Sequence, residues 1–207
     1  MAIEPINFVV FLMGPTASGK TELAIEISKH INSKLISVDS ALIYRGMDIG
    51  TAKPSKEILT AYPHELVDIC EPEDSFSVTE FISLAKEHIK SALAEGKLPI
   101  LVGGTSFYFN ALEHGLSELP SSTDESRKHF NDLLKSEGSV KLHTKLTEID
   151  PKSAARIHSN DSQRVTRALE VFHLSGKILS KLQGKKNQNK LDLNIKKIVL
   201  MPDRAIL

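Results

Sequence analysis

The chain has 207 residues, of which 41% are hydrophobic, enough for one α/β domain with an appended part and a buried core. Its 26 basic and 26 acidic side chains cancel, which excludes a general attraction to nucleic acid, so any RNA contact must come from a local patch. Cys70 is the single cysteine, and the first apolar run is too short for a signal peptide or a membrane span. We expect a cytoplasmic monomer with no membrane partner.

A glycine-rich pattern follows that first apolar run. Residues 14–21 fit the phosphate-binding loop G-x-x-x-x-G-K-[ST], between a predicted buried strand over 8–13 and a predicted helix over 20–31. They are Gly14, Pro15, Thr16, Ala17, Ser18, Gly19, Lys20 and Thr21. The pattern predicts a phosphate site in which Lys20 neutralises the terminal phosphate and Thr21 holds Mg²⁺. A glycine-rich turn that binds nothing is the alternative.

Strands and helices alternate through the first half of the chain. A second strand is predicted over 35–38, Ser77 and Glu80 form a capping box for a helix that ends at Gly96, and another strand is predicted over 98–102. This alternation predicts an α/β fold, a P-loop NTPase-like parallel sheet flanked by helices. Its ligands should lie at the carboxyl ends of the strands.

The pattern changes to helical after Pro120. A second capping-box pattern lies at Ser122 to Glu125, and apolar residues then recur at helical spacing from Phe130 to Ile149. We predict a P-loop α/β core over 1–120 and a helical insertion domain over 121–175.

The remaining residues, 176–207, are predicted to be a basic linker and a strand over 195–201 that returns to the sheet. From Gly176 onward there are eight basic residues against two acidic ones. This surplus is a local patch that could contact nucleic acid, whereas the segment 183–190 taken alone is more typical of a solvated, flexible linker.

The acid that lies at the end of a predicted strand is Asp39. An ordinary ATPase follows a later apolar strand with an acid that orders Mg²⁺ and water, yet here the strand over 98–102 is followed by Gly103, Gly104 and Thr105. Asp39 instead follows the strand over 35–38, where its carboxylate could take a proton from a nucleophile or bind Mg²⁺. The N-cap of a short helix is the alternative for this residue.

At these residues the sequence resembles the tRNA dimethylallyltransferases, also called tRNA isopentenyltransferases. The matching segments are residues 14–21, 36–54, 101–105 and 161–171, and the run from Ser37 to Pro54 is the most specific of them. The resemblance implies transfer of a dimethylallyl group from dimethylallyl diphosphate to N6 of the adenosine next to the anticodon, position 37 of the tRNA. Pyrophosphate would leave, stabilised by the loop, Lys20 and Mg²⁺ at Thr21.

The resemblance also implies residue roles. Asp39 matches the base that takes the N6 proton, and Lys20 and Thr105 complete the implied catalytic set, with Thr105 at the nucleotide or the diphosphate. The residues implied at the tRNA are Asp39, Ser40, Ala41, Leu42, Thr105, Arg127, Gln163, Arg164, Val165, Thr166 and Arg167. Arg164 and Arg167 are three apart and can share a helix face, but a plain surface helix explains them equally well.

Family members continue well beyond the point at which this sequence stops, so we expect a truncated chain that keeps diphosphate binding and is impaired in tRNA affinity and turnover. Three alternatives stay open. They are a small-molecule kinase that uses ATP, an adenylate isopentenyltransferase, and a non-catalytic RNA- or nucleotide-binding remnant.

Overall fold

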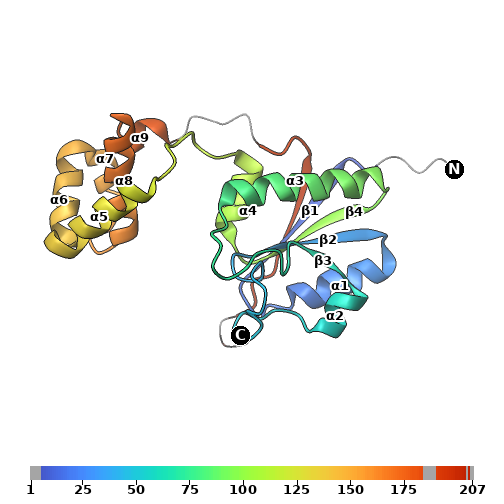
Figure 1. The fold of residues 1–207 in the computed structure, drawn as a ribbon. Coiled ribbons are helices and arrows are strands. Elements are labelled where there is room, and N and C mark those ends of the chain that lie inside the picture. Colours follow the sequence, from blue (N-terminus) through green and yellow to red (C-terminus); the bar gives the residue numbers. More distant parts are fainter. Residues whose placement is uncertain (1–5, 184–189, 204, 206–207) are drawn as a thin grey trace. The chain divides into compact units, whose positions relative to one another are not determined.

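The computed structural model describes residues 6–183, 190–203 and 205, which form two compact units (Figure 1). The sheet unit comprises the described residues up to Gly115 and those from Lys190 onward, and the helical unit runs from Leu116 to Gln183. Residues 116–120 and 176–183, which the sequence analysis assigned to the core and the linker, therefore group with the helical unit. Most of the predicted linker segment 183–190 lies outside the described residues.

The sheet unit contains a parallel sheet to which the described residues contribute five strands. They are β1 (Phe8–Met13), β2 (Ser33–Val38), β3 (His64–Glu65), β4 (Leu98–Gly103) and β5 (Asn194–Val199). The strand order is β3-β2-β4-β1-β5, and every neighbouring pair is parallel. The predicted fold class is thus confirmed, including the late strand that returns to the sheet beside β1.

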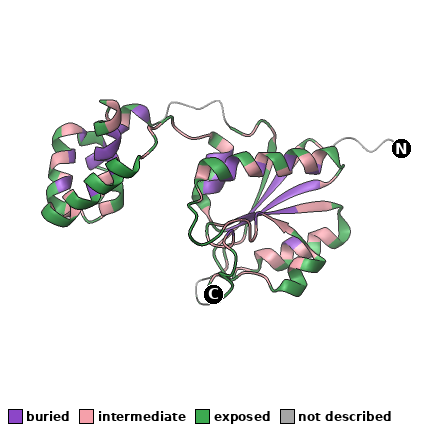
Figure 2. Cartoon of the chain, viewed as in Figure 1, coloured by how far each residue is buried: buried purple, intermediate pink, exposed green. Residues whose placement is uncertain are grey.

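Helices cover both faces of this sheet. In Figure 1, α3 (Val78–Ala94) and α4 (Ser106–His114) lie on one face, and α1 (Lys20–His30) and α2 (Lys56–Ala61) lie on the other. Because both faces are covered, β1 and β4 are apolar throughout rather than alternating, and Figure 2 shows the centre of the sheet buried. The Phe11 and Phe109 rings pack 5.0 Å apart between their centroids on the α4 side.

The predicted boundaries of α3 have a clear local cause. The Ser77 hydroxyl accepts from the Glu80 N–H while the Glu80 carboxylate accepts from the Ser77 N–H, which confirms the capping box. The chain leaves the helix at Gly96, whose φ of 67° lies in the left-handed region that favours glycine. α3 therefore begins and ends where the sequence indicated.

The helical unit is built from short helices around its own apolar core. They are α5 (Asp124–Glu137), α6 (Ser139–Ile149), α7 (Pro151–Ala154), α8 (Ser162–Ser175) and α9 (Leu179–Leu182). Phe130, Leu142, Leu146, Val165 and Leu169 form the centre of that core. The predicted helical insertion is therefore present, and no helix in the described part of the chain is long and apolar enough to cross a membrane.

The capping box predicted at Ser122 and Glu125 is wrong by one residue. The N-cap of α5 is Thr123, which exchanges hydrogen bonds with Ser126. The Ser122 hydroxyl instead donates to the Glu170 carboxylate at 2.8 Å. Only Ser122 and Glu125 fit the sequence pattern, because the pair that forms has Ser126 rather than Glu or Gln at its last position. The Ser122 hydroxyl is bound to the buried carboxylate of Glu170 on α8 and does not cap the helix.

Candidate active site

Three central strands end at the same level, which brings their following residues together. Gly103, the last residue of β4, pairs with Met13 of β1 on one side and with Val38 of β2 on the other. The phosphate loop, Asp39 and Gly104 therefore all follow the carboxyl ends of these strands, on the same side of the sheet. This is the edge at which open parallel sheets bind their ligands.

Close backbone packing at this edge leaves no room for side chains. A Cβ atom added to Gly103 would lie 2.0 Å from the Val38 carbonyl oxygen, and one added to Gly14 would lie 2.4 Å from the Leu200 carbonyl oxygen. Only glycine fits at either position. The acid that an ordinary ATPase carries after this strand is thus sterically excluded at Gly103.

The phosphate loop leads into α1 with its backbone donors exposed to the pocket. Gly19 occupies the N-cap position with a φ of 81°, and no side chain caps the helix there. Ala17 also has a positive φ, 64°, a strained conformation that is often found at functional sites. The first N–H groups of α1 can therefore serve an anion.

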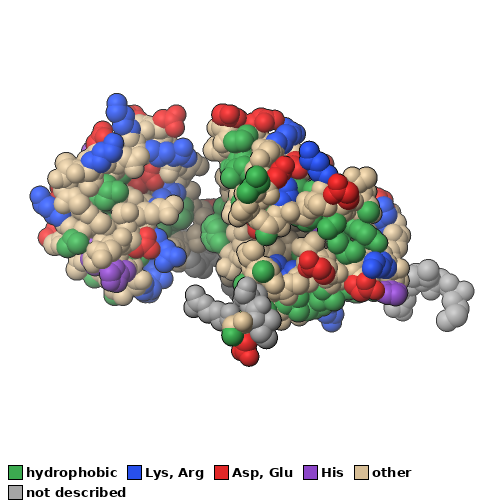
Figure 3. Space-filling view, turned by 90° about the horizontal axis from the view of Figure 1, so that it is seen from below, with side chains coloured by type: hydrophobic (Ala, Val, Ile, Leu, Met, Phe, Trp, Pro, Cys, Tyr) green, Lys and Arg blue, Asp and Glu red, His purple; other side chains and the backbone are tan. Residues whose placement is uncertain are grey.

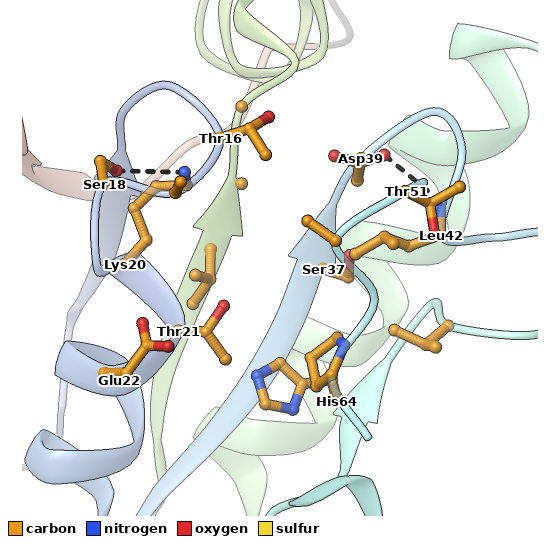
Figure 4. Close-up of a pocket in the computed structure, with 17 residues that line it drawn as sticks. Thr16, Ser18, Lys20, Thr21, Glu22, Ser37, Asp39, Leu42, Thr51 and His64 are labelled. Carbon is orange, nitrogen blue, oxygen red and sulfur yellow. Dashed lines mark hydrogen bonds between the residues drawn. The ribbon is translucent and has the colours of Figure 1, made fainter. Parts of the chain in front are cut away.

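Lys20 extends over this loop. Its ammonium donates to the Pro15 carbonyl oxygen and to the Ser18 hydroxyl, the latter at 3.3 Å (Figure 4). Burial lowers the pKa of Lys20, while the charges of Asp39 and Glu22 act in the opposite direction. The ammonium is thus bound to the loop within electrostatic range of two carboxylates, and it can exchange its loop partners for phosphate oxygens.

A single pocket joins the loop to the tip of β2. Its lining includes Lys20, Thr21 and Asp39, as predicted, together with residues from the loop after β2 and from β3 (Figure 4). The full lining is Thr16, Ala17, Ser18, Lys20, Thr21, Glu22, Ser37, Asp39, Leu42, Thr51, Ala52, Pro54, His64, Val67, Val102, Gly103 and Gly104.

The carboxylate of Asp39 is oriented by the backbone that follows it. Oδ1 accepts from the N–H groups of Ala41 and Leu42, at 2.8 and 3.3 Å. These are the contacts of a capping residue, yet a turn rather than a helix follows, so the N-cap alternative is only half realised. Figure 4 shows the second carboxylate oxygen directed toward the phosphate-loop side of the pocket.

Lys53 is a structural residue of the site that the sequence analysis did not single out. Its side chain is only 3% exposed, and its ammonium donates to the Tyr44 carbonyl oxygen and to the carboxylates of Asp48 and Asp68. These bonds tie the loop after β2 to the segment after β3. Thr51, Ala52 and Pro54, which flank Lys53, form the pocket wall opposite the phosphate loop.

Ser37 and His64 also line the pocket and were not predicted. Ser37 looks like an ordinary strand residue, and His64 belongs to no ligand-spacing motif, so no local signal marks either of them.

Among the predicted residues, Thr105 does not line the pocket, and its backbone N–H donates to the Val38 carbonyl oxygen at 3.3 Å. Ser40 is exposed beside Asp39.

The predicted RNA residues of the helical unit differ in exposure. Arg127, Gln163 and Arg164 are exposed, whereas Val165 is fully buried in the core of the unit. Figure 3 shows Lys and Arg side chains, with acidic ones among them, on one face of this unit. Only the exposed members of the predicted set can offer their side chains to a partner.

Arg167 is bonded to neighbouring parts of the helical unit, although its side chain is 33% exposed. Its guanidinium bonds the Glu170 carboxylate at 2.5 Å, the Ser122 hydroxyl and the Pro120 carbonyl oxygen. Glu170 is 5% exposed and also accepts from the Ser126 hydroxyl. These contacts hold the segment before α5 against α8, so Arg167 stabilises the helical unit whether or not it also binds RNA.

Comparison with known proteins decides the family. The family model described as IPP transferase matches residues 42–207. The chain belongs to the IPP transferase family. It is 62% identical over its full length to the tRNA dimethylallyltransferase of Ruthia magnifica and 60% identical over 204 residues to that of Vesicomyosocius okutanii. The resemblance inferred from the sequence is thereby confirmed.

Solved structures of the family share this fold. The tRNA isopentenylpyrophosphate transferase of Bacillus halodurans matches with 40% identity and a TM-score of 0.59, over 97% of this chain and 61% of that one. A eukaryotic dimethylallyltransferase acting on tRNA matches with 26% identity and a TM-score of 0.73, over 95% of this chain and 48% of that one. The chain spans 68% and 67% of the two curated relatives.

Proposed function

We propose that this chain transfers the dimethylallyl group of dimethylallyl diphosphate to N6 of the adenosine next to the anticodon in tRNA, with release of pyrophosphate. The observation that carries the proposal is the pocket that the phosphate loop shares with Asp39, whose Oδ1 is held by backbone N–H groups while its other oxygen points toward the loop (Figure 4). The names of the matched relatives support the same reaction.

The phosphate loop acts on the leaving group. As the carbon–oxygen bond of the donor breaks, negative charge grows on the departing pyrophosphate. The N–H groups at the start of α1 and the ammonium of Lys20 are positioned to stabilise that charge more strongly in the transition state than in the bound donor. Thr105 would contribute through its place beside the end of β4.

Asp39 acts on the acceptor. The exocyclic amine of adenine is a weak nucleophile that must lose a proton as the new carbon–nitrogen bond forms. Because the Ala41 and Leu42 amides hold Oδ1, the other oxygen is presented to the amine in a fixed orientation. That oxygen takes the N6 proton, a step that contributes about 10²- to 10⁴-fold in rate for a well-placed base.

Mg²⁺ fits the pocket as a cofactor. Thr21 offers a hydroxyl on the first turn of α1, Glu22 and Asp39 add negative charge, and Ser37 Oγ is a buried oxygen without a partner in the part of the chain that the structure describes. In those same residues no group of three His, Cys, Asp or Glu side chains could hold the ion alone. Thr21 would therefore share it with the diphosphate, whose charge it offsets.

Recognition of the tRNA uses both units. Ser40, Ala41 and Leu42 border the carboxylate that receives the adenosine, so the base must leave its stack to reach them, at a cost of about a few kcal/mol. Arg127, Gln163 and Arg164 present exposed polar side chains to the RNA backbone. The proposal needs one copy of the chain and no membrane.

The alternatives fit the site less well. A small-molecule kinase would need an acid at the end of β4, where the Val38 carbonyl oxygen excludes any side chain at Gly103 and the next two residues are Gly104 and Thr105. If the acceptor were a free adenine nucleotide, the exposed basic residues of the helical unit would play no part in binding it. The relatives' names refer to tRNA as well.

The test uses dimethylallyl diphosphate labelled in its dimethylallyl group and an unmodified anticodon stem-loop RNA. We expect label on the adenosine next to the anticodon and RNA-dependent release of pyrophosphate. A matched RNA with guanosine at that position should stay unlabelled. Transfer of the γ-phosphate of ATP to an acceptor, or an unlabelled adenosine at saturating donor, would overturn the proposal.

A further inference from the structure

Two buried polar atoms of pocket-lining residues have no hydrogen-bond partner in the described part of the chain. Ser37 is 3% exposed, and within the described residues neither its Oγ nor the Nε2 atom of His64 has a partner. Leaving such an atom unpaired costs about 1–3 kcal/mol. Both residues line the pocket that contains Lys20 and Thr21.

Strand register places both side chains on the same face of the sheet. His64 of β3 pairs with Leu35 of β2, and Ser37 follows Leu35 by two residues. Since side chains alternate along a strand and paired residues share a face, His64 and Ser37 both project to the side covered by α1. Figure 4 shows them in the pocket below the phosphate loop, with Thr21 on the facing helix.

The hydrogen bond on the other side of the His64 ring fixes what Nε2 can do. Nδ1 lies 2.7 Å from the Tyr62 carbonyl oxygen, and because a carbonyl only accepts, Nδ1 carries the proton. Burial lowers the pKa of His64, so the ring is neutral. Nε2 is then an acceptor, and its partner must bring a hydrogen. A phosphate oxygen, which is itself an acceptor, does not qualify.

We propose that Ser37 and His64 accept hydrogen bonds from the water shell of a divalent cation bound between Thr21 and the diphosphate. This inference rests on the proposed function. Mg²⁺ gives up its waters reluctantly, and those waters point their hydrogens outward toward acceptors. The two side chains thus form a polar floor that orients the hydrated ion, and they act without direct contact to the metal.

The negative charge of the pocket favours the same occupant. Glu22 and Asp39 both line it, and both interact electrostatically with Lys20. A hydrated cation satisfies the two acceptors and offsets these carboxylates together. A neutral water would satisfy the acceptors alone and leave one negative charge in excess, because Lys20 offsets only one of the two carboxylates.

Binding of Mn²⁺, as a probe for Mg²⁺, tests the proposal in the presence of inorganic pyrophosphate. Removing an outer partner of a metal site costs about 10- to 100-fold in metal affinity. We expect at least tenfold weaker Mn²⁺ binding for Ser37→Ala and for His64→Phe, measured by the paramagnetic resonance signal of free Mn²⁺. His64→Gln, which keeps an acceptor, should recover part of the loss.

Two controls isolate the effect. His88 lies on α3 and pairs with Glu65 outside the pocket, so His88→Gln should bind Mn²⁺ like the parent. Pyrophosphate affinity without metal should be unchanged in all four variants. Unchanged Mn²⁺ affinity in Ser37→Ala and His64→Phe would overturn the proposal, as would an equal loss of metal-free pyrophosphate binding, which would mean that the residues touch the anion.

The parent protein supplies a measurement that does not depend on any variant folding. In ¹⁵N spectra of the histidine rings, the Nε2 resonance of His64 should move when Mg²⁺ and pyrophosphate are added together, but not with pyrophosphate alone. A stationary resonance would refute the proposal. Neither assay uses RNA or a prenyl donor, so failure here is distinct from failure of the alkylation assay.

Discussion

Replacing Gly103 by alanine perturbs the point at which three strands meet the pocket. The added Cβ would lie 2.0 Å from the Val38 carbonyl oxygen, whereas real Cβ atoms essentially never come closer than 3.0 Å to a neighbour. The backbones of β2 and β4 must therefore separate by about 1 Å. Because backbone cannot swing aside as a flexible side chain can, we expect destabilisation of about 3 kcal/mol, the upper part of the usual range for overpacking.

Gly104→Ala is the matched control. It makes the same chemical change one residue later, where the nearest atom to the added Cβ is the Gly14 carbonyl oxygen at 3.4 Å. We expect a change below about 1 kcal/mol in urea unfolding for this variant. Because the distortion at Gly103 also shifts Asp39 relative to the phosphate loop, pyrophosphate binding should weaken in Gly103→Ala alone. Equal unfolding free energies for the two variants would refute the packing argument.

Three further predictions concern charged residues. Lys53→Met should lower the unfolding free energy by about 2 kcal/mol in a denaturant titration, because it removes charged hydrogen bonds inside the pocket wall. Lys56 is exposed, so Lys56→Met should change the unfolding free energy by less than about 0.5 kcal/mol. Hydrogen bonds from two lysines and a serine hold the pKa of the Glu95 carboxyl at about 2. The stabilising contribution of Glu95 is therefore present above pH 4.5 and is lost as the pH falls toward 2. A carboxyl NMR titration with a midpoint near 4.5 would contradict this prediction. Arg164→Gln should weaken RNA binding and reduce its salt dependence without lowering the melting temperature. Arg167→Gln should lower the unfolding free energy by about 2 kcal/mol. The opposite pattern would give the two residues the reverse roles.

Much of the sheet unit follows from local sequence. The apolar run from Phe8 to Met13, the glycine pattern after it and the capping box at Ser77 each depend on neighbours within a few residues, and each lies where the sequence indicated. The position of Asp39 in the pocket was predictable because ligands bind at the carboxyl ends of parallel strands. These features carry their signal in a single segment.

Other features depend on partners far away in the chain. Glu170 draws Ser122 away from the capping role, and the same carboxylate holds Arg167. The need for glycine at residue 103 comes from a carbonyl on β2, and the tautomer of His64 comes from the Tyr62 carbonyl oxygen. Such contacts appear only once the strands and helices are assembled, so sequence patterns do not reveal them.

The role of Asp39 as the base is tested most directly by Asp39→Asn. The asparagine keeps an oxygen that can accept from the Ala41 and Leu42 amides, so the loop should stay in place, but it cannot take the N6 proton. Single-turnover alkylation of the anticodon stem-loop should slow by about 10²- to 10⁴-fold, with pyrophosphate affinity unchanged. Alkylation at the parent rate would contradict the account.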